Sequence, residues 1–177
     1  MRLSERPLIA QAEIDECVKR LARDIAARHQ DGRGLVLVVV LKGATIFAAD
    51  LMRCLDVHPL RIEYIRAKSY DGTHSMGEVE LIVLPDLSVA GQRVLVVEDI
   101  LDTGRTTTAI LSALENANPA SLELCTLLDK PSRRVVPVDA QYVGFSIDDH
   151  FVVGYGLDYR EAYRSLPEIY VLEPSNG

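Results

Sequence analysis

The sequence has few cysteines, and their spacing does not match the sites that cysteines usually build. Cys17, Cys54 and Cys125 lie far apart among the 177 residues, and no pair has the CxxC spacing. Neither a disulfide framework nor a zinc module is therefore expected. The four histidines form no HExxH motif and no pair at i, i+4, which also argues against a zinc site. This composition fits a reducing compartment, the cytoplasm, best.

Long hydrophobic runs are also lacking. Residues 1–7 lack the apolar core of a signal peptide, and every later apolar run is shorter than the roughly 20 residues that a membrane helix needs. Hydrophobic residues still make up 48% of the chain, which is enough for a sizeable core, and no linker or repeat divides it. We expect a soluble protein that does not bind membranes and in which residues 1–177 form one domain.

Basic residues are outnumbered by acidic ones. The 19 Lys and Arg against 26 Asp and Glu give a formal charge of −7, which disfavours nucleic acid as a partner. A phosphorylated small ligand stays compatible, because backbone N–H groups at a helix start or Mg²⁺ bind it whatever the net charge. The sequence has no GxxxxGK[ST] motif, so a nucleotide triphosphatase of the P-loop class is disfavoured.

Hydrophobic periodicity predicts helices and strands that alternate along the chain. Helices are expected at 12–28, 45–55 and 106–116, and strands at 34–41, 60–66, 79–84, 93–97, 122–128, 142–145, 151–157 and 169–172. The aliphatic runs at 34–41 and 93–97 are typical of strands buried on both faces of a parallel sheet. We expect an α/β fold with an open, mostly parallel twisted sheet flanked by helices, and a small flap or hood built from the chain ends.

The most informative segment joins a buried strand to a helix at residues 96–107. Glu98, Asp99 and Asp102 end the strand, and the run from Thr103 to Thr107 opens the helix. Hydroxyls and unpaired amides at a helix N-terminus can bind a phosphate monoester, and the acids can bind sugar hydroxyls or Mg²⁺. The alternative is that Thr106 only caps the helix and the acids form a solvated turn.

This segment closely resembles the phosphoribosyl pyrophosphate signature of the type I phosphoribosyltransferases. The diagnostic parts are Glu98-Asp99 and Asp102-Thr-Gly-Arg-Thr106. Further segments match in order, namely Leu41-Lys-Gly43, Lys68-Ser-Tyr70, Leu128-Asp-Lys130 and Phe151 to Tyr159. Together they resemble the hypoxanthine-guanine phosphoribosyltransferases across nearly the whole chain.

The resemblance implies a purine-salvage enzyme that needs Mg²⁺. It would join hypoxanthine or guanine, which are 6-oxopurines, to the ribose of phosphoribosyl pyrophosphate, and so form IMP or GMP and release pyrophosphate. Asp102 would be the general acid and base at N7 of the purine. Glu98 and Asp99 would hold the ribose hydroxyls and, with Asp158, the Mg²⁺ ion. The 5′-phosphate would be bound by Thr103, Gly104, Arg105, Thr106 and Thr107.

The resemblance also implies which residues bind pyrophosphate and the purine base. Lys42, Gly43 and Arg164 would bind pyrophosphate, in a loop where the family often carries a cis peptide that does not precede proline. The base would be contacted by Lys130 at O6, by the Phe151 ring through stacking, by the Val152 backbone and by Asp158 at C2. The alternatives are that Lys42 is a solvated charge after a strand, that Phe151 and Val152 belong to the core, and that Arg164 forms an ordinary surface salt bridge.

Two rival functions and the assembly stay open. A phosphoribosyltransferase for xanthine, adenine or uracil would share the phosphate signature but not Lys130 or the segment 151–158. A regulatory relative that senses phosphoribosyl pyrophosphate or binds RNA can lack the aspartate and often has a basic face, whereas here Asp102 is present and the chain is acidic. Family members commonly form homodimers or homotetramers; helix 45–55 is a candidate interface, unless its apolar face is core.

The polar segment from Lys68 to Gly77 predicts a mobile lid, with Ser69 and Tyr70 as its contact to the ligand. Closure would exclude water, which competes as the nucleophile. Deletion of residues 71–76 should lower the rate of transfer while the fold is preserved, as measured by initial rates and circular dichroism. Unchanged turnover would contradict the lid assignment.

Overall fold

The structure is a computed structural model that describes residues 1–69, 79–83 and 88–174. Within them, no helix combines the length and the apolarity that crossing a membrane requires. The helices are α1 (Gln11–His29), α2 (Thr45–Cys54), α3 (Arg105–Glu115) and the single 3₁₀ turn η1 (Pro131–Arg133). The strands are β1 (Arg2–Leu3), β2 (Leu35–Leu41), β3 (Leu60–Ser69), β4 (Val79–Val83), β5 (Arg93–Leu101), β6 (Ser121–Asp129), β7 (Tyr142–Ser146), β8 (Val152–Val153) and β9 (Tyr170–Glu173).

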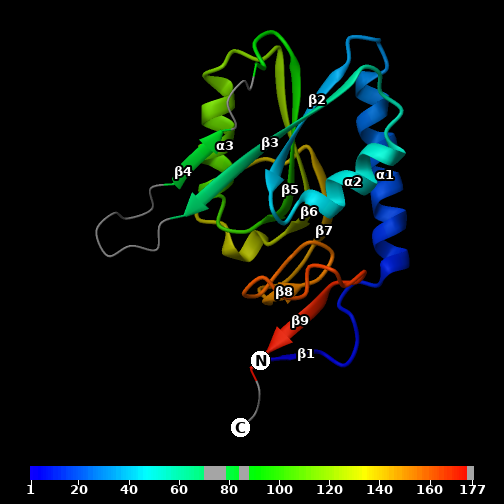
Figure 1. Ribbon diagram of the computed structural model, residues 1–177, viewed down its shortest axis with the longest axis vertical. Coiled ribbons are helices and arrows are strands. Elements are labelled where there is room, and N and C mark those ends of the chain that lie inside the picture. Colours follow the sequence, from blue (N-terminus) through cyan, green and yellow to red (C-terminus); the bar gives the residue numbers. More distant parts are fainter. Residues whose placement is uncertain (70–78, 84–87, 175–177) are drawn as a thin grey trace.

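A six-stranded sheet in the order β4-β3-β2-β5-β6-β7 runs through the molecule (Figure 1). The strands β3, β2, β5, β6 and β7 pair in parallel, whereas β4 pairs antiparallel to β3. In β2 every residue except Leu41 is buried, and the sequence there is only leucine and valine. Burial on both faces removes the need for polar alternation, so the parallel sheet expected from the aliphatic runs is confirmed.

Helices cover both faces of this sheet. On one face α1 and α2 pack in a cluster with Leu37 and Val39 of β2, and on the other face α3 packs with Val36 and Val38 (Figure 1). This alternation of neighbouring strand residues is the period of a β-strand. The residues that the helical spacing places on the apolar side of α1 are all buried: Ile14, Cys17, Val18, Leu21 and Ile25.

The apolar side of α2 also belongs to the core. Phe47, Ala48 and Leu51 are almost completely buried within the chain and lie in the same cluster as α1. Of the two alternatives for this helix, a core face or an interface, its apolar face is therefore part of the core.

A second, three-stranded antiparallel sheet in the order β1-β9-β8 joins the two ends of the chain. Arg2 pairs with Glu173, and Val152 pairs with Val171. It lies below the main sheet in Figure 1, near both termini. The expected flap built from the chain ends is thus confirmed, and it carries the segment around Phe151.

Three expected boundaries need correction. The strand predicted at 93–97 runs to Leu101, because β6 offers backbone partners as far as Asp129. The strand predicted at 60–66 runs to Ser69, so the start of the expected lid is strand, while Tyr70 and the rest of that segment lie outside the described residues. The strand predicted at 151–157 is only Val152–Val153, because Gly154 and Gly156 adopt positive φ and turn the chain.

Candidate active site

Loops that follow the parallel strands meet at one edge of the main sheet. Parallel strands all end at the same edge, which is where open α/β sheets bind ligands. Lys130, directly after β6, donates from Nζ to the backbone oxygen of His150 at 2.6 Å. A Cβ built on Gly156 would lie 2.2 Å from the oxygen of Gly43, which follows β2. The loop after β6 is therefore in direct contact with the loop after β7, and the loop after β2 with the loop after β8.

The turn after β2 lies against an acidic side chain of β5. The peptide bond between Leu41 and Lys42 is cis, a feature that the family often carries in this loop. A Cβ built on Gly43 would lie 1.6 Å from Oδ2 of Asp99. A side chain at this position would force the Asp99 carboxylate to move, so the Gly43 backbone closely approaches that carboxylate.

Glu98 and Asp99 lie inside β5, where Glu98 is buried and Asp99 is half-buried. The side chain of Glu98 is 6% exposed, and its Oε2 has no hydrogen-bond partner in the described part of the chain. Burial, and then the charge of Asp99, raises the pKa of Glu98 well above its usual value. Burial also raises the pKa of Asp99 to about 6, against the opposing effects of the Ile100 backbone N–H and of Arg164.

The carboxylates predicted to bind Mg²⁺ do not form a preformed cage. Within residues 1–69, 79–83 and 88–174, no group of three or more His, Cys, Asp or Glu side chains could hold a metal ion. Glu98 and Asp99 diverge because neighbouring strand residues point to opposite faces. The set Glu98, Asp99 and Asp158 as metal ligands stays a prediction.

A site with fewer protein ligands fits the same residues. Mg²⁺ is commonly bound by one or two carboxylates together with substrate phosphates. The charge of Asp158 contributes to the raised pKa of Asp99, so these two carboxylates repel each other. A cation bound to them with its substrate would offset that repulsion.

Asp102 begins the turn between β5 and α3, and its side chain is 39% exposed. It accepts a hydrogen bond from Nε of Arg133 at 3.2 Å, and the same Nε lies 3.6 Å from Oδ1 of Asp149. Asp149 in turn lies 3.8 Å from Nζ of Lys130. Asp102 and Lys130, which are predicted to contact the neighbouring N7 and O6 atoms of one purine, thus belong to one network of charges.

Hydrogen bonds from the segment 134–136 hold the turn around Asp102 and Thr103. The backbone N–H groups of Val135 and Val136 donate to the oxygen of Thr103 at 2.9 and 3.0 Å. Arg134 donates to the backbone oxygen of Asp102 and to the carboxylate of Asp129. These bonds fix the main chain of the predicted phosphate loop in place.

Helix α3 begins at Arg105, and no side chain caps its start. Gly104 is the N-cap residue with φ of 82°, and a Cβ there would lie 2.4 Å from the oxygen of Val136. The alternative in which Thr106 caps the helix is therefore wrong. Thr107 is buried, whereas the side chain of Arg105 is exposed. The first turn offers backbone donors and hydroxyls to an anion.

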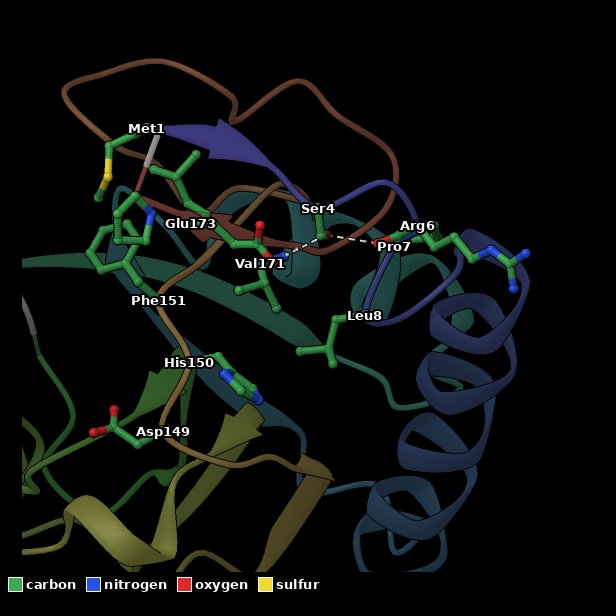
Figure 2. Close-up of a pocket in the computed structure, with 12 residues that line it drawn as sticks. Met1, Ser4, Arg6, Pro7, Leu8, Asp149, His150, Phe151, Val171 and Glu173 are labelled. Atoms are coloured by element: carbon green, nitrogen blue, oxygen red, sulfur yellow. Dashed lines mark hydrogen bonds between the residues drawn. The ribbon is translucent and has the colours of Figure 1, made fainter. Parts of the chain in front are cut away.

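Phe151 and Val152 have different environments. Val152 is buried in the core, whereas Phe151 is 50% exposed and meets the Tyr159 ring edge-on at a centroid distance of 5.8 Å. A core role, the alternative considered for this pair, therefore applies only to Val152. Figure 2 shows Asp149, His150 and Phe151 in succession along one wall of a cavity of about 600 Å³, which the N-terminal residues and β9 close from the other side.

The residues predicted to bind pyrophosphate converge, together with an acid that was not predicted. Nζ of Lys42 lies 3.0 Å from Oε1 of Glu161, and Nη2 of Arg164 lies 3.3 Å from Oε2 of the same side chain. Arg164 also binds Oδ1 of Asp158 at 2.7 Å and donates to the oxygen of Gly156 at 2.8 Å. Lys42, Asp158 and Arg164 thus share one charge cluster.

Comparison with known proteins identifies the family. Residues 9–160 match the family model described as phosphoribosyl transferase domain. The hypoxanthine-guanine phosphoribosyltransferase of Staphylococcus aureus strain Mu50 is 45% identical over 168 residues, which are 94% of this chain and 93% of that protein. The chain belongs to the hypoxanthine-guanine phosphoribosyltransferase family. The predicted family and enzyme class, a purine-salvage phosphoribosyltransferase, are confirmed.

Solved structures of this family share the fold. A crystal structure of a hypoxanthine-guanine phosphoribosyltransferase from Bacillus anthracis, with HEPES in the active site, has a TM-score of 0.90 and 41% identity over 97% of this chain and 100% of that chain. A variant of the Trypanosoma cruzi hypoxanthine phosphoribosyltransferase in a ternary substrates complex has a TM-score of 0.89 and 40% identity over 97% and 96%.

The same domain also occurs within longer proteins. The bifunctional protein TilS/HprT of Listeria innocua is 43% identical over 171 residues. These cover 96% of this chain but only 26% of that protein, so the chain spans about a quarter of the length of this relative.

Four polar residues at this site were missed from the sequence. Arg133 and Arg134 follow Lys130 so closely that their basic pair was a usable signal for an anion or carboxylate nearby. Asp149 and Glu161 gave no such signal, since their partners lie on other loops. All four residues belong to the candidate site of this chain, because each contacts a residue that was predicted from the sequence.

Asp99→Asn should stabilise the ligand-free chain at pH 8 and change its stability little near pH 3.5. The folded-state pKa of about 6 lies above the usual 3.8, so the folded chain loses stability as pH rises from about 4 through 6. The neutral amide avoids this loss. We expect a gain in Tm of about 2 to 6 °C at pH 8, measured by differential scanning calorimetry.

The matched control for this substitution is Asp139→Asn, because Asp139 is exposed. Its Tm should stay close to that of the wild type at both pH values. A Tm of Asp99→Asn at or below the wild-type value at pH 8 would contradict the assignment of an unfavourable buried charge.

Proposed function

We propose that this chain transfers the phosphoribosyl group of phosphoribosyl pyrophosphate to hypoxanthine or guanine, forming IMP or GMP and pyrophosphate. The observation that carries the proposal is the network that joins Asp102 at the uncapped start of α3 to Lys130 and to the segment that bears Phe151. In this proposal, the network would hold the proton-transfer group between the phosphate loop and the base site.

The base would lie against the exposed ring of Phe151. Lys130 has three donors, of which one is used by the oxygen of His150, so another is available for O6 of a 6-oxopurine. Asp102, a carboxylate with an arginine partner, would exchange the proton at N7. Val152 would contact the edge of the base through its backbone, and Asp158 would contact the group at C2.

The 5′-phosphate would lie at the start of α3. Backbone N–H groups and the hydroxyls of Thr103, Thr106 and Thr107 would donate to it, and the positive end of the helix dipole favours an anion there. Gly104 permits close approach of the main chain. Arg105 has an exposed side chain and would act only at the outer side of the phosphate.

Pyrophosphate would be held by Lys42, Arg164 and the backbone of Gly43. Glu98 and Asp99 would hold the ribose hydroxyls, and Asp99 with Asp158 would hold Mg²⁺, while Glu98 would reach it through water. When bound, Mg²⁺ would neutralise the charge of the leaving pyrophosphate as the bond at the anomeric carbon breaks. Ser69 and Tyr70 stay predicted as contacts of a lid that excludes water.

The wider setting of the enzyme is also part of this proposal. Residues 1–177 would form one domain that acts in the cytoplasm without nucleic acid or membrane partners. A homodimer or homotetramer is proposed by analogy with the family. One Trypanosoma cruzi relative was studied for the role of its C-terminal region in oligomeric state and enzymatic activity.

The activity is tested by ultraviolet assays of nucleotide formation from phosphoribosyl pyrophosphate and Mg²⁺ with hypoxanthine, guanine, xanthine and adenine in parallel. Turnover is expected with the first two only. Adenine has an amino group at C6, where Lys130 needs an acceptor, and xanthine has an oxygen at C2 that would face the Asp158 carboxylate. Removal of Mg²⁺ with a chelator should abolish it. Turnover of xanthine or adenine would contradict the base site, and no turnover at all would favour a regulatory relative.

Asp102→Asn separates an enzyme from a sensor of phosphoribosyl pyrophosphate. The amide cannot exchange the N7 proton, so kcat should fall by about 10²- to 10⁴-fold, while the affinity for phosphoribosyl pyrophosphate, measured by calorimetry, should stay within about threefold. Unchanged turnover would contradict the role of Asp102 in proton transfer.

A further inference from the structure

Two cations of the proposed pyrophosphate site are already bound to one carboxylate of the chain. Glu161 accepts hydrogen bonds from Nζ of Lys42 at 3.0 and 3.2 Å and from Nη2 of Arg164 at 3.3 Å. Lys42 and Glu161 are 119 residues apart in sequence, so the pair is formed by the fold rather than by a local turn. Lys42, and after it Arg164, holds the pKa of Glu161 below its usual value.

The ion pairs of Glu161 are weak enough for another anion to displace its side chain. Its side chain is 67% exposed and that of Lys42 is 51% exposed, and ion pairs in water contribute little to stability. Arg164 is different, because it is 26% exposed and is also held by Asp158 and by the oxygen of Gly156. If Glu161 moves away, Arg164 keeps its place and Lys42 becomes free for another anion.

The backbone conformation around Glu161 favours its pairing with Lys42 in the ligand-free chain. Arg160, Glu161 and Tyr163 have φ of 52°, 64° and 77°, in the left-handed region that such residues rarely adopt. The turn is closed by the Glu161 N–H, which donates to Oδ2 of Asp158 at 2.8 Å, and by paired bonds between Tyr159 and Ala162. The turn therefore holds the Glu161 side chain toward Lys42 without any ligand.

We propose that Glu161 is an internal counter-ion of the pyrophosphate site, which pairs with Lys42 and Arg164 in the ligand-free chain and is displaced when pyrophosphate binds. Since binding must break these ion pairs, Glu161 lowers the affinity for pyrophosphate and for the diphosphate group of phosphoribosyl pyrophosphate. It thereby speeds release of the pyrophosphate product. The inference rests on the proposed function, because it takes Lys42 and Arg164 as ligands of the diphosphate.

The test is isothermal titration of inorganic pyrophosphate in Mg²⁺ buffer against the wild type and Glu161→Gln. The glutamine keeps the size and loses the charge, so its Kd should fall by about three- to tenfold. Glu115→Gln, an exposed position at the end of α3, is the matched control for the change in net charge and should keep the wild-type Kd. The KM for phosphoribosyl pyrophosphate should fall with Glu161→Gln, and kcat should not rise.

The affinity for IMP separates this role from a structural one. IMP would use the phosphate loop at α3 and the base site, so its Kd should be the same in Glu161→Gln and the wild type. Weaker binding of both ligands would show a structural role and overturn the inference. Unchanged or weaker binding of pyrophosphate alone would also overturn it. A wild type that binds no pyrophosphate would overturn the proposed pyrophosphate site and the inference with it.

Discussion

The strands β2 and β5 are buried on both faces, and this double burial determines where charged groups can stand. A charge in the middle of either strand would lie in the apolar core without water, so charged residues appear only towards the strand ends. Both strands leave the core at the carboxyl end, with Lys42 after one and Glu98 and Asp99 at the end of the other. Because parallel strands end at one edge, residues more than 50 positions apart become neighbours there. The phosphate loop, Lys130 and the loop 149–164 are arranged around this edge.

Charges at this edge are paired before any substrate arrives. Arg133 binds Asp102 and lies close to Asp149, Arg164 binds Asp158, and Lys42 binds Glu161. An acidic chain of formal charge −7 can therefore bind a polyanion by exchanging one acidic partner for another. A site whose cations are already paired is more selective than one with unpaired cations, because unpaired cations would attract any anion. It also keeps the bound state reversible, as a catalyst that must release pyrophosphate requires.

The centres of the elements could be predicted from the sequence, and the ends could not. Aliphatic runs and helical spacing locate β2, β5 and α1 because burial leaves its pattern in the side chains. The end of β5 is set by backbone hydrogen bonds to β6, which leave no such pattern, so the inclusion of Glu98 and Asp99 in the strand was missed. Motif resemblance identified Lys42 and Arg164, whereas Glu161 is recognised only when two distant loops are seen in contact.

The flap has a consequence for how the protein is made. Its sheet combines β1, which precedes the other elements described, with β8 and β9, which are synthesised after the main sheet. On the ribosome, the strands and α3 that carry the phosphate loop are complete while the partner of β1 is still missing. Phe151 lies next to β8, and its backbone oxygen accepts a hydrogen bond from Leu172 of β9. The wall that would contact the purine therefore closes only after β9 has been synthesised, and a nascent chain could acquire the phosphate loop well before it can recognise a base.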